Sequence, residues 1–240
     1  MHKFEYMDKI YQVLDKVTEK NEENILILAR EIANNIKNDK IIHTFGTGHS
    51  HMIGIELFVR AGGLGNIDSI LDANVLTSAG ARRSGELERV SGLSDVIFNN
   101  YIIEKGDMMI ICSNSGRNAM PIEMAQRCKK EGVFTVAVTN LEQSKQSTSR
   151  HHSGKKLYEC VDLVLDNCVP FGDALVDVDG IKTGPGSSIT SMFILNTAIT
   201  EAIRICKREG IDVSVFQSQN VDGFNNDKIY DKYQNRVKHI

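Results

Sequence analysis

The sequence of 240 residues predicts an α/β fold, a three-layer αβα sandwich around a five-stranded parallel sheet. Short apolar segments are expected to form the strands, at 41–45, 66–70, 107–112, 133–138 and 161–165. Helical patterns alternate with most of them, notably at 50–60, 118–131 and 186–208. Apolar strands that alternate with helices are typical of a parallel sheet covered on both faces.

The first 38 residues are expected to form an N-terminal helical pair. Apolar side chains recur at helical spacing over 4–17 and 25–36, and the polar stretch 20–24 lies between them. The C-terminal stretch carries a thin apolar stripe at i+4 spacing, which predicts packing on the body or on a partner subunit. We therefore expect one domain, divided into N-terminal helices, a core and a C-terminal extension at 1–38, 39–210 and 211–240.

Three connections are longer than such a fold needs, at 71–100, 143–156 and 166–187. Long unstructured connections inside a compact domain are usually functional. The last of them is expected to be a lid over a ligand site or part of a dimer contact. Its alternating acids lack the glycine and terminal glutamate of a calcium loop.

Composition excludes several classes of protein. Acids and bases are well mixed at a net charge of −3, which disfavours nucleic acid as a partner. The start resembles no signal peptide, and no run of about 18 apolar residues occurs, so we expect a cytoplasmic protein without membrane contact. The five cysteines never form a C-x-x-C pair, which disfavours a redox or structural zinc role.

Two turns of small residues carry the strongest functional signal. Gly46–Ser50 follows the first expected strand, and Ser113–Asn118 follows the third. Such turns direct backbone N–H groups and hydroxyls at an anion beside a helix N-terminus, so together they predict one small phosphorylated ligand. A dinucleotide is the alternative, since Asp68 has suitable spacing for a ribose contact, but the third glycine of that motif is missing.

The paired turns resemble the sugar isomerase (SIS) domain family over about residues 20–210. The likeness extends to Val138–Asn140 and to the Ser/Thr-rich start of the late helix at 186–190. Over its whole length the chain resembles uncharacterised single-domain members of the family, some of which are named as phosphoheptose isomerases. It implies a flavodoxin-like sheet, a phosphosugar ligand and a homo-oligomer, dimer or tetramer, with shared active sites. The residues it implies for the phosphosugar are Gly48, Ser50, Ser113, Ser115, Gly116, Asn118, Ser187 and Ser188.

An aldose–ketose isomerase of this kind needs an acid/base group to move a proton between adjacent carbons. Glu88 is the first choice and Glu86 the second, because both lie in a Gly/Ser-rich connection. His49 is a further acid/base candidate. Pairing of the two glutamates with Arg82 and Arg83 is the structural alternative. Such a proton transfer needs no redox cofactor.

Other roles for these residues remain open. The stretch 85–92 is similar to N-acetylmuramic acid 6-phosphate etherases, which implies a lyase with Glu88 as its glutamate, and a non-catalytic phosphosugar sensor is the third possibility. No further ligand pattern accompanies His49 and His51, so we expect no metal. His151 and His152 are expected in a solvated basic loop or at a subunit contact, as candidates for opening the sugar ring. His43 is expected to be a core residue.

Overall fold

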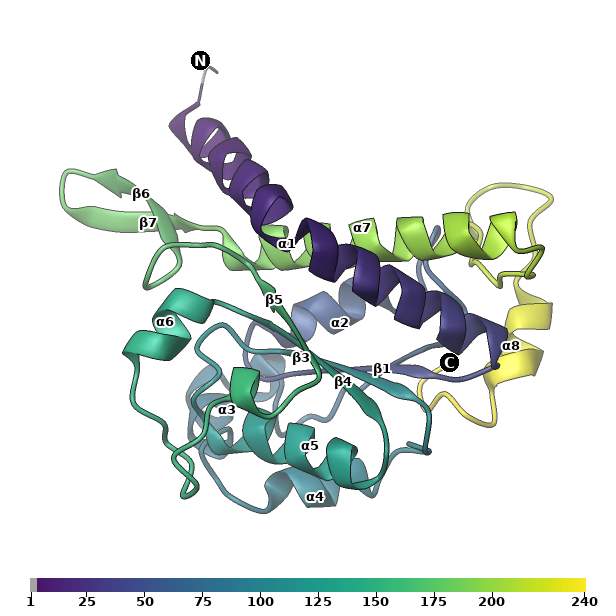
Figure 1. The fold of residues 1–240 in the computed structure, drawn as a ribbon, viewed down its shortest axis with the longest axis horizontal. Coiled ribbons are helices and arrows are strands. Elements are labelled where there is room, and N and C mark those ends of the chain that lie inside the picture. The colour runs from purple at the N-terminus through teal and green to yellow at the C-terminus, as the bar shows by residue number, and fades with distance from the viewer. Residues whose placement is uncertain (1–3) are drawn as a thin grey trace.

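The computed structural model describes residues 4–240 and has a five-stranded parallel sheet at its centre (Figure 1). The strands lie in the order β2-β1-β3-β4-β5, which is the flavodoxin-like order. Their bounds are β1 (Ile42–Gly46), β2 (Ile67–Ser69), β3 (Met108–Cys112), β4 (Phe134–Thr139) and β5 (Leu163–Asp166). The predicted fold class and all five predicted strands are confirmed.

The predicted N-terminal helical pair is wrong, because α1 (Glu5–Lys37) is one continuous helix of 33 residues. The polar stretch 20–24 contains no glycine or proline that would break it. Instead, this stretch is where α1 meets the end of β5. The buried Asn21 side chain donates to the Asp166 carbonyl at 2.9 Å and accepts from the Asp166 amide at 2.8 Å. Lys20 pairs with the Asp166 carboxylate at 2.6 Å.

Replacing Asn21 by alanine is expected to destabilise the protein, because both backbone groups of Asp166 would lose their partner in a buried place. Each unsatisfied buried group costs about 1–3 kcal/mol, so the free energy of unfolding should fall by about 2 kcal/mol or more. Urea unfolding measures this. Asn34→Ala on the exposed face of α1 is the matched control. An equal effect of both variants would contradict the role of Asn21.

The other helices follow the predicted pattern, with bounds α2 (His51–Leu57), α5 (Ala119–Lys130) and α7 (Ser187–Arg208). The prediction that the long connections are unstructured is wrong for the first and the third, which contain helices and strands. The first contains a 3₁₀ turn η1 (Thr77–Ala79), α3 (Ala81–Leu87) and α4 (Leu93–Phe98). The remaining elements are α6 (Leu141–Gln146), η2 (Leu157–Glu159), the strands β6 (Ala174–Val178) and β7 (Ile181–Pro185), and α8 (Asp227–Tyr233).

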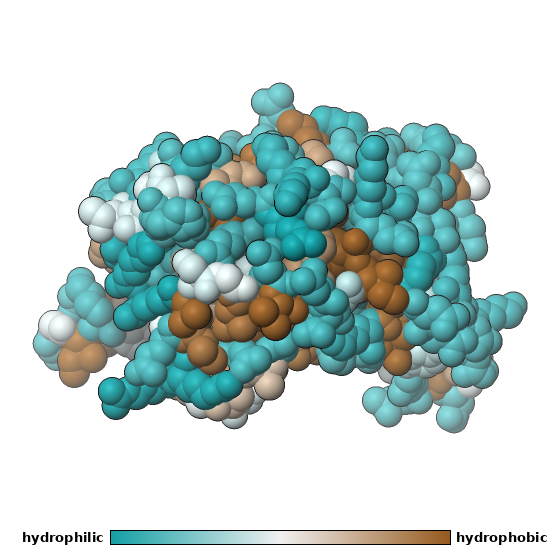
Figure 2. Space-filling view, turned by 90° about the horizontal axis from the view of Figure 1, so that it is seen from below, coloured by the Kyte–Doolittle hydropathy of each residue, from teal (hydrophilic) through white to brown (hydrophobic). Residues whose placement is uncertain are grey.

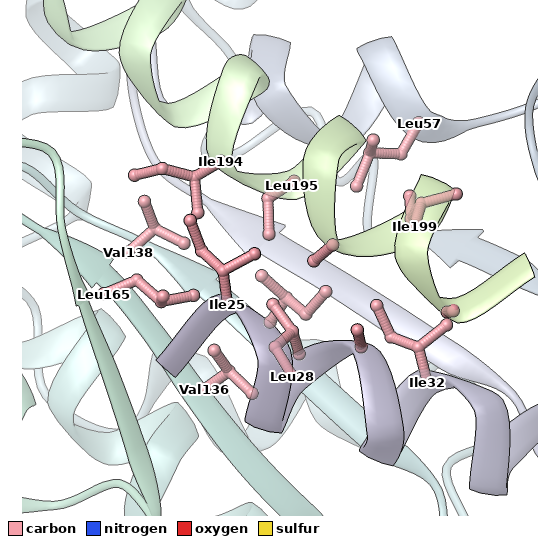
Figure 3. Close-up of a cluster of buried hydrophobic side chains, with 14 of the residues drawn as sticks. Ile25, Leu28, Ile32, Leu57, Val136, Val138, Leu165, Ile194, Leu195 and Ile199 are labelled. Carbon is pink, nitrogen blue, oxygen red and sulfur yellow. The ribbon is translucent and has the colours of Figure 1, made fainter. Parts of the chain in front are cut away.

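The sheet is buried on both faces by side chains that alternate along each strand. Met108 and Ile110 of β3 join α1, α2 and α7 in one cluster, whereas Met109 and Ile111 join α4 and α5 in another. Figure 3 shows the first cluster, where side chains from α1 and α7 interdigitate above the sheet. The labelled contributors include Leu28, Ile32, Val136, Leu165, Ile194 and Leu195.

The hairpin β6–β7 projects beside the N-terminal end of α1 (Figure 1). Asp179 and Gly180 form its two-residue turn with φ of 50° and 89°, the left-handed conformations that a type I′ turn requires. The Tyr6 hydroxyl donates to the Pro185 carbonyl at 2.7 Å and so ties α1 to the base of the hairpin. In the C-terminal extension, Tyr233 and Val237 pack on Ile41, which confirms that its stripe covers the body.

Within residues 4–240, α7 is the single helix whose length and composition would allow it to cross a membrane. Its apolar side belongs to the core, where Ile194, Leu195 and Ala198 are fully buried against α1 and the sheet. On the opposite side of the molecule, Figure 2 shows a mostly hydrophilic surface with separate apolar patches. The apolar character of α7 is therefore explained by its place in the core.

Candidate functional site

The two small-residue turns meet at the carboxyl edge of the sheet, between the neighbouring strands β1 and β3. Gly46 and Cys112 are register partners, so both turns leave the sheet at the same level. This is the switch point of the sheet, where ligands bind in open α/β folds. A cavity of about 150 Å³ lies there, lined by His49, Ser50, Ile53, Ser113, Asn114, Val138, Asn167, Asp173, Ser187, Ser188 and Ser191.

The first turn is tight because its first residue is glycine. A Cβ at Gly46 would lie 2.6 Å from the backbone carbon and oxygen of Ser50, so a larger residue cannot occupy this position. Ser50 precedes α2, but its hydroxyl makes no capping bond and lines the cavity instead. The exposed His49 also lines the cavity. The Gly48 amide donates to the Val75 carbonyl at 3.0 Å, so it is already engaged within the chain.

The second turn curls over itself. Gly116 has a φ of 56° and donates its amide to the Ser113 Oγ at 3.2 Å. A Cβ there would lie 3.2 Å from Leu157 Cβ and Ser144 Oγ, which explains why this position is glycine. Ser113 accepts this bond and keeps its own hydrogen for another partner. The Ser115 hydroxyl makes no hydrogen bond to residues 4–240 and is available to a ligand.

Glu88 joins the two turns. Its carboxylate accepts a hydrogen bond from the Thr47 hydroxyl at 2.8 Å and from the Asn118 amide at 2.7 Å. Its backbone carbonyl accepts from the Met120 amide at the start of α5. The side chain is half-buried. Glu88 and Asn118 do not line the cavity described above, but the Glu88 carboxylate is hydrogen-bonded to one residue of each turn that forms it.

Glu86 lies elsewhere. Its side chain is 66% exposed and pairs with Arg82 one turn earlier on α3, at 3.2 Å. This is the structural alternative predicted for these acids, and it holds for Glu86. Arg83 bonds the Asn74 side chain instead of a glutamate. The structure thus separates the two glutamates that the sequence left as first and second choice.

Asp173 occupies the positive end of α7. Its carboxylate accepts from the amides of Gly186 and Ser187 at 3.0 and 2.7 Å, and from the Ser187 hydroxyl at 2.6 Å. A negative charge is stabilised at this end of a helix. Ser188 and Ser191 make no side-chain hydrogen bond to the described part of the chain, and both line the cavity.

Sequence reasoning missed a group of arginines beside the second turn. Arg150 donates to the Asn118 side-chain oxygen at 3.1 Å, and Arg117 donates to Thr148 at 3.0 Å. The Nε of Arg117 is buried and has no hydrogen-bond partner within residues 4–240. Burial and the nearby charges of Arg117 and Arg89 lower the pKa of Arg150. These arginines come from separate segments, so no local sequence motif predicts that they lie together.

His43 is a fully buried core histidine, as predicted. Its Nδ1 lies 3.1 Å from the Asp68 carboxylate and its Nε2 lies 3.4 Å from that of Asp107. Burial disfavours the charged ring, but hydrogen bonds and attraction from both carboxylates outweigh it, so the pKa of His43 is raised. Asp68 is fully buried in this cluster and also accepts from the Lys238 amide. A ribose contact by Asp68 is therefore excluded.

His151 and His152 differ in their surroundings. The His151 side chain is fully buried rather than solvated, whereas His152 is exposed. Their rings are 4.0 Å apart between centroids. Burial and the neighbouring His152 lower the pKa of His151. Neither residue lines the cavity at the two turns.

Comparison with known proteins agrees with this architecture. The model of the SIS domain family matches residues 5–140. The UPF0309 proteins of Thermoanaerobacter pseudethanolicus and Geobacillus kaustophilus are 38% and 37% identical, over 98% and 97% of this chain and 99% and 94% of their own lengths.

Solved structures share the fold at low sequence identity. Phosphoheptose isomerase GmhA from Neisseria gonorrhoeae is 13% identical with a TM-score of 0.56, over 82% of this chain and 95% of that one. The Vibrio vulnificus NanR protein, complexed with ManNAc-6P, is 15% identical with a TM-score of 0.53, over 85% and 63%. The matched family model, together with relatives that align over almost their whole length, shows that this chain belongs to the SIS domain family.

Proposed function

We propose that this protein binds a phosphorylated sugar at the carboxyl edge of the sheet and interconverts its aldose and ketose forms. The observation that carries the proposal is the convergence of serine hydroxyls from three elements, Ser50, Ser113, Ser187, Ser188 and Ser191, on one cavity. Hydroxyls in this number suit a ligand that is itself rich in hydroxyls. The fold neighbours include a phosphoheptose isomerase and a protein complexed with ManNAc-6P, which supports the class of ligand.

The phosphate is expected at the second turn rather than at α7. Asp173 already supplies a carboxylate to the start of α7, and a second anion there would be repelled. At the second turn, Ser113 and Ser115 offer hydroxyls, the N-terminus of α5 lies next in the chain, and Arg117 and Arg150 add positive charge. Gly116 shapes this turn, and Asn118 orients Glu88 rather than the phosphate.

Catalysis is assigned to Glu88. The Glu88 carboxylate is hydrogen-bonded to both turns, so a sugar whose phosphate lies at the second turn is expected to place its reacting carbons beside it. It would take the proton from one carbon and return it to the next, which are the two steps of an enediol mechanism. His49, exposed at the rim of the cavity, would exchange protons with the sugar hydroxyls. We further propose a cytoplasmic homo-oligomer whose neighbouring subunit completes the site.

Phosphosugars are expected to raise the melting temperature of the protein, because a ligand bound only by the folded state stabilises it. The test is a panel of hexose, heptose and N-acetylated amino-sugar phosphates. The double variant Ser113→Ala/Ser115→Ala should weaken binding about tenfold or more, since each hydrogen bond to a charged group contributes about 1.5–3 kcal/mol. Ser218→Ala, in a separate cavity, should leave binding unchanged.

Incubation of each stabilising sugar, followed by NMR, distinguishes the alternatives. Isomer interconversion supports the isomerase. Release of lactate from a muramic acid derivative would replace it by an etherase-like lyase, and stabilisation without any turnover would replace it by a sensor. If no phosphosugar raises the melting temperature, the binding proposal itself fails.

A further inference from the structure

Glu123, His151 and His152 form a cluster that the phosphosugar site does not use. Glu123 lies on α5, and the histidines lie in the loop between α6 and η2. One ligand atom from each lies within 4.8 Å of the other two, and among residues 4–240 this is the single such group of three or more metal-ligating side chains. We infer that this cluster is a binding site for a divalent transition metal, zinc in particular.

The first observation is the geometry of His151. Its side chain is fully buried, yet its Nε2 has no hydrogen-bond partner within the described chain and lies 3.5 Å from Glu123 Oε1. That separation is too long for a good hydrogen bond. It matches two ligands of one tetrahedral zinc ion, whose bonds of about 2.0–2.1 Å place ligand atoms about 3.4 Å apart. The exposed His152 supplies the third ligand, since one of its ring nitrogens lies within 4.8 Å of the ligand atoms of the other two residues.

The second observation is the support behind each ligand. The other ring nitrogen of His151, Nδ1, lies 2.7 Å from Ser153 Oγ, and the second oxygen of Glu123 accepts from the Gly92 amide at 2.8 Å. Metal-binding histidines and carboxylates are usually held in this way by groups behind them. Imidazole nitrogen with one carboxylate is a donor set that suits zinc better than calcium or magnesium.

The charge around the cluster permits a cation. The cavity beside it, about 320 Å³, is also lined by Asp95, Arg127 and Lys130. Arg127 is neutralised by ion pairs with Asp95 and Glu131, at 3.1 and 3.0 Å. Lys130 is exposed, so water screens its charge. This cavity shares no lining residue with the cavity at the two turns.

Metal binding here would act on the loop rather than on the sugar. Arg150 directly precedes His151. It donates a hydrogen bond to the Asn118 side chain, which in turn donates to the Glu88 carboxylate. An ion held between the loop and α5 would fix the loop, and with it the position of Arg150. The site is thus a structural clamp, independent of which phosphosugar binds.

The test is calorimetric titration of the chelator-treated full chain with zinc chloride, with cobalt absorption as a second readout. We expect about one ion per chain and a visible cobalt spectrum of tetrahedral type. His152→Ala, which removes a direct ligand at an exposed position, should weaken zinc binding by more than about tenfold, the lower end of the loss caused by removing a partner behind a ligand. Ser153→Ala should weaken it less.

His49→Ala is the control that separates this site from the histidines of the first turn. It should leave zinc affinity unchanged. The inference is overturned if wild-type protein takes up no zinc, if His152→Ala binds as tightly as wild type, or if His49→Ala abolishes binding. Phosphosugar binding is measured separately by melting temperature, so failure of the metal site and failure of the proposed function are distinguishable.

Discussion

Glu88→Gln is expected to lower turnover of the phosphosugar by about 10²–10⁴-fold, the usual contribution of a general acid–base group. The amide cannot take the proton from the sugar carbon. It keeps the size of the side chain and one oxygen that still accepts a hydrogen bond. One of the two hydrogen bonds from Thr47 and Asn118 can therefore still form. The loss should therefore appear in kcat, with KM changed much less.

The matched variant is Glu86→Gln, two residues earlier. Its carboxylate pairs only with the exposed Arg82, and such surface pairs contribute about 0–1 kcal/mol to stability. Turnover by this variant should equal that of wild type. Reversal of the two results, with Glu86→Gln inactive and Glu88→Gln active, would transfer the role to Glu86. Deuterium exchange at the sugar carbons, followed by NMR, reports the proton transfer directly.

His43→Leu is expected to destabilise the protein by about 3–5 kcal/mol, because it leaves two buried carboxylates without a counter-charge. Asp68 and Asp107 are 0% and 2% exposed, so water cannot compensate. Urea unfolding measures the loss. Adding Asp68→Asn to His43→Leu removes one uncompensated charge and should recover part of the stability. If the double variant is less stable than the single one, the loss comes from packing and not from charge.

The same cluster predicts a pH dependence. Since the pKa of His43 is raised in the folded state, its contribution is fully present below the unfolded value, about pH 6.5, and disappears as pH rises through the folded value. At acid pH the Asp107 carboxyl contributes a pH dependence of the opposite sign. Burial opposes ionisation of Asp107, but hydrogen bonds from His43 and two backbone amides lower its pKa, so its contribution is lost as pH falls through that lowered value. His43→Leu should flatten the alkaline decline.

Hydrophobic periodicity was sufficient to predict the sheet, because buried parallel strands are continuous apolar runs. It failed at 20–24, where polarity resembled a break between helices. Asn21 is polar because it satisfies backbone groups at the end of β5, a reason that depends on a strand about 145 residues away in the chain. Local patterns contain no information on such a partner.

The position of the two turns at the ends of their strands could be predicted from the sequence, but the arrangement of the side chains around them could not. Residues 86 and 88, two positions apart on a helical segment, point about 200° apart around the axis, so only the placement of α3 shows which one meets the turns. Likewise, the basic loop at 150–156 looked solvated, yet the hydroxyls of Ser149 and Ser153 fold it so that His151 is buried.

The bond between α1 and β5 also bears on how the chain folds. Helix α1 precedes β5 and α7 in the chain and is therefore synthesised before both, yet it packs on these two elements. Contacts between such distant segments slow folding, because a long loop must close before they form. Until then the apolar stripe of α1 stays open to solvent in the nascent chain, and this is the stage at which aggregation or chaperone binding competes with folding.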